Sequence, residues 1–380
     1  MSERSRLVDA GFDVVVIGAG VIGLAIATAL SRLGRTVLIL ERDIGIGRGI
    51  TSRNSEVIHA GLYYPANSLK AKLCVSGREA LYGYCASNGV AHRRLGKLVV
   101  ATSHDDESVV SNLLDRGREN GVRGLELIDS REISRLEPDV KARLALHSRD
   151  TGIVDGQALC LALLAESERN GVVLALGADV RELTQRSFGW EVEVSRSSGD
   201  SEQIGAGVVI DAGGLDADHI ASLAGLDIDA LGWRQYPCKG DYFVLGPGSS
   251  SVNVSRLIYP VPGQAGLGIH ATLDLAGRIR FGPDTEYVRK PIFDVDPNKA
   301  LRFRSATANY LPGLADAEFV PDYAGIRPKL AGPGEGFRDF VIEETSSHGV
   351  PGFVACLGIE SPGLTASLAI GEYVAKHVLN

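Results

Sequence analysis

The 380-residue sequence predicts an α/β protein with two interleaved domains, one containing a parallel Rossmann-like sheet and one containing an antiparallel sheet. Three observations lead to this prediction. A glycine-rich turn joins an apolar strand to a helix near the N-terminus, and residues 155–183 read as a helix followed by apolar strands. Residues 240–282 read as alternating strands separated by Gly and Pro turns. The first two patterns favour a parallel sheet covered by helices, and the third favours an antiparallel sheet built to hold a ligand.

The first element is a βαβ unit over residues 13–41. The apolar strand 13–17 runs directly into Gly18-Ala19-Gly20-Val21-Ile22-Gly23, and a second strand over residues 36–40 ends at an acid. In this context the glycines allow a tight turn, close approach of backbone to a pyrophosphate, and close packing of helix on strand, while the helix N-terminus attracts phosphate. The alternative is a buried βαβ unit with glycines but no ligand. The candidate nucleotide-binding residues are Gly18, Gly20, Val21, Ile22, Gly23, Glu41, whose carboxylate can accept from a ribose hydroxyl, and Arg42.

The remaining elements follow in blocks. A strand, a helix and a strand are expected at 96–102, 105–120 and 125–128 as an excursion from the first domain. A helix at 155–170 with Asp155 as its N-cap and strands of parallel type at 172–176 and 179–183 return the chain to it. A hairpin with strands at 190–194 and 208–211 and a turn at 195–201 then ends at Ala212-Gly213-Gly214.

Composition limits the class of protein. The 47 acidic residues exceed the 39 basic ones, giving a formal charge of −8, which argues against a nucleic-acid partner and requires locally placed cations for any anionic substrate. The five cysteines are scattered and show no metal-binding spacing, so we expect a reduced compartment and no metal site. Residues 1–11 lack the apolar segment of a secretory signal, and no integral membrane segment is expected. These patterns predict a cytoplasmic protein, with peripheral contact to a membrane left open.

Three further segments carry a family resemblance: residues 51–74 (TSRNSEVIHAGLYYPANSLKAKLC), 325–330 (GIRPKL) and 358–374 (GIESPGLTASLAIGEYV). Together with the glycine motif, they closely resemble the L-2-hydroxyglutarate dehydrogenase-like branch of the D-amino-acid-oxidase-like (DAO) family of FAD-dependent oxidoreductases, over nearly the full length. The resemblance implies FAD as the cofactor and an FAD-binding domain of the glutathione-reductase type. It implies that this domain comprises residues 10–92, 146–225 and 322–380, with a substrate domain of residues 93–145 and 226–321.

The resemblance also assigns cofactor contacts. The loop after the second strand would run along the pyrophosphate toward the flavin, a backbone group in the strand at 179–183 would hold adenine, and the C-terminal helix would direct its N-terminus at the flavin pyrimidine edge. Without a cofactor, the same segments would be a surface turn, a buried valine, a strand-end turn and a capped terminal helix. The residues concerned are Thr51, Ser52, Arg53, Asn54, Ser55, His59, Val180, Ala212, Gly213, Arg327, Gly358, Ser361, Pro362, Gly363, Leu364 and Thr365.

Candidate catalytic residues come from two of these segments and from the region of the expected antiparallel sheet. His270, in an apolar strand that passes over the flavin in similar oxidases, is favoured as the base, and His59 as a flavin neighbour that tunes or links the cofactor. Arg327 can grip a carboxylate with two parallel hydrogen bonds. Lys329 flanks Pro328 together with Arg327. Tyr259, with Lys239 and Tyr242, could donate to a second carboxylate, and these three are weaker candidates. The alternatives are a core histidine, a solvated Arg–Lys pair and aromatic packing.

The function that this predicts is oxidation of a small L-2-hydroxy acid to the 2-oxo acid by hydride transfer to flavin N5. Electrons then pass to a quinone, an electron-transfer protein or O₂. After the segment IYPVP the sequence departs from the 2-hydroxyglutarate enzymes in three ways. The stretch between IYPVP and the next motif is shorter, Ala271 replaces an aromatic residue, and Pro283-Asp284-Thr285 replaces Pro-Asn-Ala. An amino acid or secondary amine oxidase that releases peroxide is therefore an alternative. A non-catalytic FAD-binding regulatory protein, whose flavin no substrate bleaches, is another.

Overall fold

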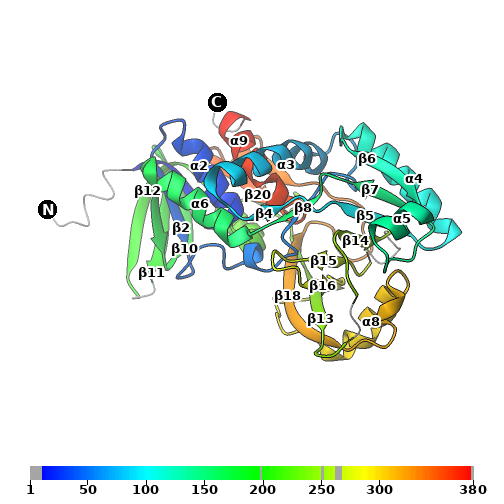
Figure 1. The fold of residues 1–380 in the computed structure, drawn as a ribbon. Coiled ribbons are helices and arrows are strands. Elements are labelled where there is room, and N and C mark those ends of the chain that lie inside the picture. The colour runs from blue at the N-terminus through cyan, green and yellow to red at the C-terminus, as the bar shows by residue number, and fades with distance from the viewer. Residues whose placement is uncertain (1–10, 197–198, 250–251, 262–267, 378–380) are drawn as a thin grey trace. The chain divides into compact units, whose positions relative to one another are not determined.

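A computed structural model describes residues 11–196, 199–249, 252–261 and 268–377 (Figure 1). The chain divides into two compact units: unit 1 comprises Met1–Ser52, Gly156–Tyr236 and Pro328–Asn380, and unit 2 comprises Arg53–Asp155 and Pro237–Arg327. Both the predicted domains and these units interleave along the chain. They differ chiefly at residues 53–92, which were predicted with the nucleotide domain and belong to unit 2. The assignment of FAD and substrate binding to separate domains stays a prediction.

Unit 1 contains an eight-stranded sheet with β1 near its centre. β1 pairs in parallel with β2 and β12, β9 continues beyond β2, and β20 pairs in parallel with β12. β10 and β11 extend the sheet as antiparallel strands, and β19 pairs antiparallel with β20. The strands are β1 (Phe12–Ile17), β2 (Val37–Glu41), β9 (Val173–Leu176), β10 (Ala178–Arg186), β11 (Gly189–Arg196), β12 (Ser201–Asp211), β19 (Val341–Glu344) and β20 (Phe353–Leu357).

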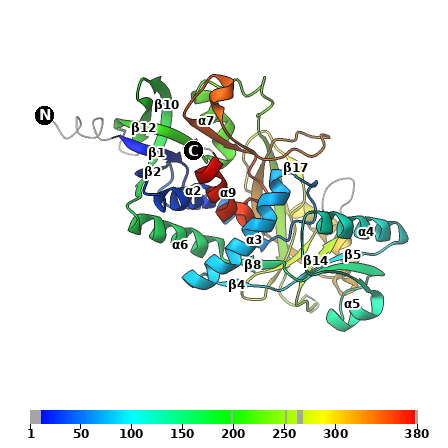
Figure 2. The same cartoon turned by 90° about the horizontal axis from the view of Figure 1, so that it is seen from above.

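The helices of unit 1 are α2 (Val21–Ser31), α6 (Gly156–Arg169), α7 (Ala217–Leu223) and α9 (Gly363–His377), with 3₁₀ turns η1 (Ile50–Ser52), η2 (Gly214–Asp216) and η5 (Thr345–His348). α2 lies between α6 and α9 and contacts both (Figure 2). Apart from Ile22, every residue of α2 is buried, which explains its apolar composition on all sides. A Cβ on Gly371 of α9 would come within 2.5 Å of the Ala25 carbonyl oxygen, so this glycine allows the close packing of α9 on α2.

Unit 2 contains a nine-stranded sheet in the order β17-β13-β16-β15-β14-β5-β7-β6, with β18 paired to β13, and a small sheet β3-β8-β4. The large sheet consists of β5 (Lys97–Ala101), β6 (Leu125–Asp129), β7 (Leu144–Ser148), β13 (Tyr236–Leu245), β14 (Leu257–Pro260), β15 (Ala271–Leu273), β16 (Ile279–Phe281), β17 (Glu286–Tyr287) and β18 (Phe319–Lys329). The small sheet consists of β3 (Val57–Ile58), β4 (His92–Arg93) and β8 (Gly152–Val154). Its helices are α3 (Leu69–Asn88), α4 (His104–Glu119), α5 (Ser130–Leu136) and α8 (Ala300–Ala308), with η3 (Pro297–Lys299) and η4 (Pro312–Leu314).

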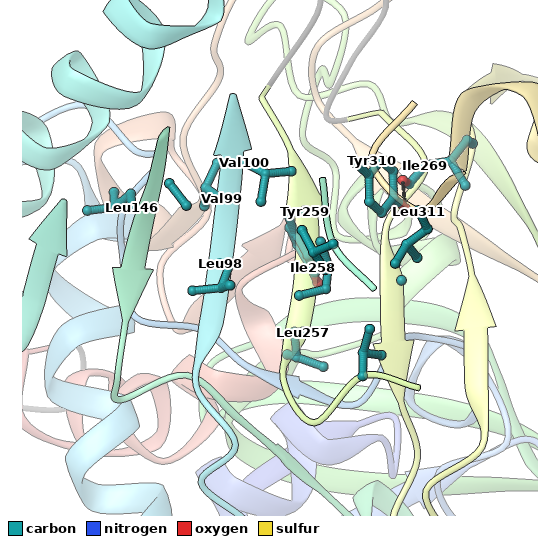
Figure 3. Packing of buried hydrophobic residues seen from close by; sticks show 14 of the residues in the cluster. Leu98, Val99, Val100, Leu146, Leu257, Ile258, Tyr259, Ile269, Tyr310 and Leu311 are labelled. Atoms are coloured by element: carbon teal, nitrogen blue, oxygen red, sulfur yellow. Dashed lines mark hydrogen bonds between the residues drawn. The ribbon is translucent and has the colours of Figure 1, made fainter. Parts of the chain in front are cut away.

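The core of unit 2 lies along β14 and β5. Figure 3 shows the side chains of β14 beside those of β5, with Tyr310 reaching toward Ile269. The Tyr310 hydroxyl donates to the Ile269 carbonyl at 2.8 Å, so the buried phenol is satisfied and fixes the residue that precedes His270.

Most predicted elements are present, and one feature of the pairing was predicted wrongly. Residues 179–183 were expected to be a parallel strand, but among the described residues β10 pairs with β11 and does so antiparallel. The strands of residues 240–282 pair antiparallel with one another, as expected, and β14 also pairs in parallel with β5, which lies outside that range. His270 also precedes β15 rather than lying in a strand. The first ten residues, part of the 195–201 turn and most of the shortened stretch after IYPVP lie outside the described residues.

Within the described ranges, no helix combines the length and apolar character needed to cross a bilayer. All five cysteines are buried, and none of them is in a disulfide.

Candidate active site

The glycine turn of unit 1 has the geometry that its motif predicts. Gly18 has φ +103°, and a Cβ there would lie 2.5 Å from the Ala212 carbonyl oxygen. A Cβ on Gly23 would lie 2.0 Å from the Gly18 carbonyl oxygen, so only glycine lets α2 start this close to the turn. A Cβ on Gly20 would lie 3.3 Å from Thr51 Oγ1, which is less crowded than at Gly18 and Gly23.

The start of α2 leaves free donors. The Val21 N–H donates to Thr51 Oγ1 at 3.1 Å, and the Leu24 N–H begins the helical ladder by donating to the Gly20 carbonyl. The N–H groups of Ile22 and Gly23 have no partner in the part of the chain that the structure describes. Such amides at a helix N-terminus form an anion-binding site.

Glu41 is held at the end of β2. Its Oε2 accepts from the Ala19 N–H at 2.7 Å and its Oε1 from the Asp43 N–H at 2.9 Å. These bonds orient the carboxylate beside the glycine turn, and each oxygen keeps a second lone pair for a ribose hydroxyl. Arg42 forms an ion pair with Asp216 at 2.7 Å, so its predicted cofactor contact competes with a partner already present.

The other predicted contacts of unit 1 sit at element ends. Val180 lies on β10, an edge strand with a register shift between Val180 and Glu182, so backbone groups there are not all used by the ladder. At the end of β12 the Gly213 N–H donates to Asp211 Oδ1 at 2.9 Å, beside Ala212. Ser52 faces its own turn, donating to the Arg48 and Gly49 carbonyls.

The C-terminal loop is shaped by a glycine. Gly358 has φ +69°, a Cβ there would lie 2.6 Å from the Leu330 side chain, and its N–H donates to Gln235 Oε1 at 2.8 Å. The Gly363 N–H donates to the Glu360 carbonyl, and α9 begins there, as the glycine-rich pattern predicts. The contacts of Ser361, Pro362, Leu364 and Thr365 with a flavin stay predictions. Lys329 lies 3.7 Å from Glu360 in an ion pair, which weakens the expectation that it binds substrate.

In unit 2, residues 53–55 are anchored by side chains of the same unit. The Arg53 guanidinium lies 4.5 Å from the Phe293 ring centroid, the Tyr323 hydroxyl donates to the Asn54 carbonyl at 2.6 Å, and Ser55 Oγ lies 2.7 Å from the Tyr242 hydroxyl. Tyr242, predicted as a donor to a second carboxylate, therefore holds this loop and stacks on Tyr323. The pyrophosphate contacts expected of the loop stay predictions.

His270 lies in a polar cluster inside the apolar core of unit 2. It is buried, and its ring stacks on Tyr259 with centroids 3.5 Å apart and planes 10° from parallel. Lys97 Nζ lies 4.7 Å from the ring centroids of both Tyr259 and Tyr63. Burial and the nearby Lys97 charge lower the pKa of His59 to about 3, so its imidazole is neutral at physiological pH. Of the predicted residues, the structure thus brings Tyr259 and His270 into contact, and His59 has the Lys97 charge nearby.

The Arg327 guanidinium donates most of its hydrogen bonds to backbone carbonyls. Its Nη2 donates to the Lys239 and Asp284 carbonyls, the latter at 2.6 Å, and its Nε donates to the Cys238 carbonyl. Nη1 has no partner within the described ranges. Of the guanidinium, the two Nη1 hydrogens therefore remain to bind a carboxylate, whereas two parallel hydrogen bonds were predicted.

A buried charge network occupies the region where the sequence departs from the resembled family. Lys299 Nζ lies 2.6 Å from Asp241, 3.0 Å from Asp284 and 2.6 Å from Glu286, while Lys239 lies 3.0 Å from Asp241. Asp284 also accepts from the Asp241 N–H at 2.8 Å. Lys239 was predicted as a donor to substrate, but the structure pairs it with an acid instead.

Comparison with known proteins identifies the family. Residues 13–377 match the family described as FAD dependent oxidoreductase (DAO). The chain belongs to it. It is 39% identical to "L-2-hydroxyglutarate dehydrogenase, mitochondrial" of Arabidopsis thaliana, covering 97% of this chain and 83% of that one, and 28% identical to "Glycerol 3-phosphate dehydrogenase" of Caloramator mitchellensis, covering 97% and 74%. The solved structure of L-alpha-glycerophosphate oxidase from Mycoplasma pneumoniae with FAD bound superposes with a TM-score of 0.85 at 23% identity, covering 96% and 94%.

This FAD oxidoreductase presents a cradle that fits its cofactor. The free N–H groups of Ile22 and Gly23, beside the less crowded Gly20, suit a pyrophosphate, and the oriented Glu41 carboxylate suits a ribose. When bound, FAD supplies a two-electron acceptor for substrate oxidation.

Two buried ionisable residues of the oxidoreductase were not among the site residues predicted from its sequence. Lys97 is 1% exposed within GKLVVAT, where a lysine in an apolar strand was the available signal. Asp211 is fully buried at the end of β12, and its signal was an acid directly after Val-Val-Ile. Its Oδ2 has no partner in the described residues.

Replacing Asp211 with Asn is expected to stabilise the protein increasingly as pH rises. Burial raises the pKa of Asp211 well above its usual value, although the Gly213 N–H opposes this. Above the unfolded pKa the unfolded carboxyl loses its proton while the folded one keeps it, so stability falls with pH until the folded pKa is passed. Asn stays neutral in both states. Thermal unfolding at pH 8 should therefore favour the variant by at least about 1 kcal/mol, with less difference at pH 5.

The exposed Asp115→Asn serves as the control for this comparison. If the Asp211→Asn advantage is the same at both pH values, the buried carboxyl is not kept protonated.

Proposed function

We propose that the protein oxidises a small L-2-hydroxy acid of the 2-hydroxyglutarate type to the 2-oxo acid. The observation that carries the proposal is the 39% identity, over 97% of the chain, to a protein named L-2-hydroxyglutarate dehydrogenase. The buried cluster of unit 2 supports it, because a histidine and two cations that lack carboxylate partners suit an anionic hydroxy acid. The relative's name favours a hydroxy acid over the amine considered from the sequence.

In the proposed reaction, Arg327 Nη1 binds the C1 carboxylate and orients C2. A ring nitrogen of His270 would take the hydroxyl proton as the C–O bond becomes a carbonyl. FAD, when bound, would accept the hydride from C2, which leaves the 2-oxo acid as product. The apolar walls of unit 2 around Tyr259 exclude water from the histidine. His59, neutral at physiological pH, adds no charge that would compete for the substrate carboxylate.

The test is anaerobic addition of L-2-hydroxyglutarate to purified FAD-loaded protein while the visible flavin band is recorded. Bleaching of the band is expected. A flavin that stays oxidised with this diacid and with other L-2-hydroxy acids would reject the proposal. Peroxide yield during aerobic turnover then separates O₂ from a quinone or an electron-transfer protein as acceptor.

Changing Arg327 to Lys is expected to raise the KM for the hydroxy acid by about 10-fold, with a smaller effect on kcat. Lysine keeps the charge but has no planar fork that can hold backbone carbonyls and a carboxylate together. Steady-state kinetics with an artificial electron acceptor measure both constants. Lys329→Arg is the control in the same segment, and unchanged saturation in Arg327→Lys would remove Arg327 from substrate binding.

A further inference from the structure

Lys97 is a buried cation with no carboxylate beside it. It is 1% exposed, and in the described part of unit 2 no acid forms an ion pair with it. Two other buried cations differ from it: Arg78 pairs with Glu79, and Lys239 pairs with Asp241. A buried ammonium without an anion is costly, so its retention calls for a compensating partner.

The groups that face Lys97 are neutral or aromatic. Tyr63 and Tyr259 present their rings at 4.7 Å from Nζ, and burial keeps both phenols protonated by raising their pKa values. Burial raises the pKa of the Cys74 thiol to about 12, and His59 is neutral. Burial lowers the pKa of Lys97 itself to about 7, with the Cys74 sulfur opposing weakly. An incoming anion would therefore meet no competing carboxylate at Lys97, and its negative charge would favour the protonated ammonium.

The position of Lys97 relative to the proposed catalytic residues follows from the sheet order. Arg327 on β18 lies against β13, His270 directly precedes β15, and Lys97 begins β5. Because the strands run in the order β13-β16-β15-β14-β5, His270 falls between the two cations along the sheet. His270 stacks on the Tyr259 ring and Lys97 Nζ lies 4.7 Å from the centroid of the same ring, so the two groups share this neighbour. The extended chain of a five-carbon diacid spans about 4 Å from C2 to C5.

We propose that Lys97 binds the distal anionic group of the substrate, a carboxylate three carbons from the reacting C2, while Arg327 binds the proximal one. This rests on the proposed function and names the group that would select a diacid over a simple hydroxy acid. Lys97 then acts in binding and specificity, and His270 remains the base.

The first test measures binding without turnover. Glutarate and butyrate, which differ by one carboxylate, are titrated into FAD-loaded wild type, Lys97→Met and Lys97→Arg, and the shift in thermal unfolding and the perturbation of the flavin spectrum are recorded. We expect glutarate to bind wild type more tightly than butyrate, and Lys97→Met to weaken glutarate about 10- to 100-fold. Lys97→Arg should recover part of this. Equal weakening of both acids, or none of either, would overturn the role.

The second test uses turnover. In Lys97→Met the fall in kcat/KM should be at least about 10-fold larger for L-2-hydroxyglutarate than for L-2-hydroxybutyrate, and mainly in KM. sn-Glycerol 3-phosphate as a third substrate shows whether the distal anion is a carboxylate or a phosphate. If neither hydroxy acid reduces wild type while glutarate binding still depends on Lys97, the proposed reaction fails and the anion site stands. If Lys97→Met loses FAD or unfolds, the affinities of wild type and Lys97→Arg for glutarate and butyrate decide instead.

Discussion

Replacing His270 with Ala is expected to lower the rate of flavin reduction by the hydroxy acid by about 10²-fold or more. His270 is the buried imidazole of the unit 2 cluster, and its ring lies against Tyr259 in the apolar core. Without a base, the hydroxyl proton has no acceptor as the hydride leaves, and the surrounding apolar walls exclude water from that task. Anaerobic stopped-flow mixing with substrate measures the rate directly.

Two controls make this result interpretable. His104→Ala changes a histidine whose side chain is 79% exposed, so it reports any general effect of removing an imidazole. His270→Asn keeps a polar side chain and limits the cavity beside Tyr259, which separates loss of the base from loss of packing. A His270→Ala enzyme that is reduced at the wild-type rate removes this residue from the chemistry.

Replacing Gly23 with Ala should yield a protein that retains little FAD and is less stable by about 1–3 kcal/mol. The added methyl would meet the Gly18 carbonyl oxygen at 2.0 Å, and that oxygen belongs to backbone that cannot turn aside. α2 must then move away from the turn, and the Ile22 and Gly23 amides no longer converge on one phosphate position. The ratio of flavin to protein absorbance after purification and the unfolding midpoint measure the two effects.

Gly83→Ala is the matched control, because a Cβ on this glycine of α3 meets nothing within 4 Å. There the substitution is expected to be neutral or slightly stabilising, as alanine favours a helix. If Gly23→Ala binds FAD stoichiometrically and unfolds at the wild-type temperature, the close contact at the turn does not matter for the cofactor.

The local motifs of unit 1 could be predicted because each is confined to a few adjacent residues. The Gly18 turn and its junction with α2 follow from backbone sterics alone, and the structure confirms their geometry. The pairing of β14 with β5 could not be predicted, since those strands are more than 150 residues apart and a short apolar strand carries no mark of its partner. Lys239 has its acid, Asp241, two residues further along the same strand, where side chains share a face. The neighbours of Lys97 are the rings of Tyr63 and Tyr259, which lie far from it in sequence and could not be predicted.

The insertion of β20 next to β12 has a consequence for how the protein is made. β20 pairs in parallel with a strand that ends at Asp211 and itself adjoins β1. The sheet that carries the glycine turn therefore stays incomplete on the ribosome until residues 353–357 have emerged, more than 300 residues after β1. Such non-local pairing slows folding and leaves strand edges exposed in the meantime. Folding of unit 1 thus waits for the synthesis of β20 rather than following directly on its early βαβ segment.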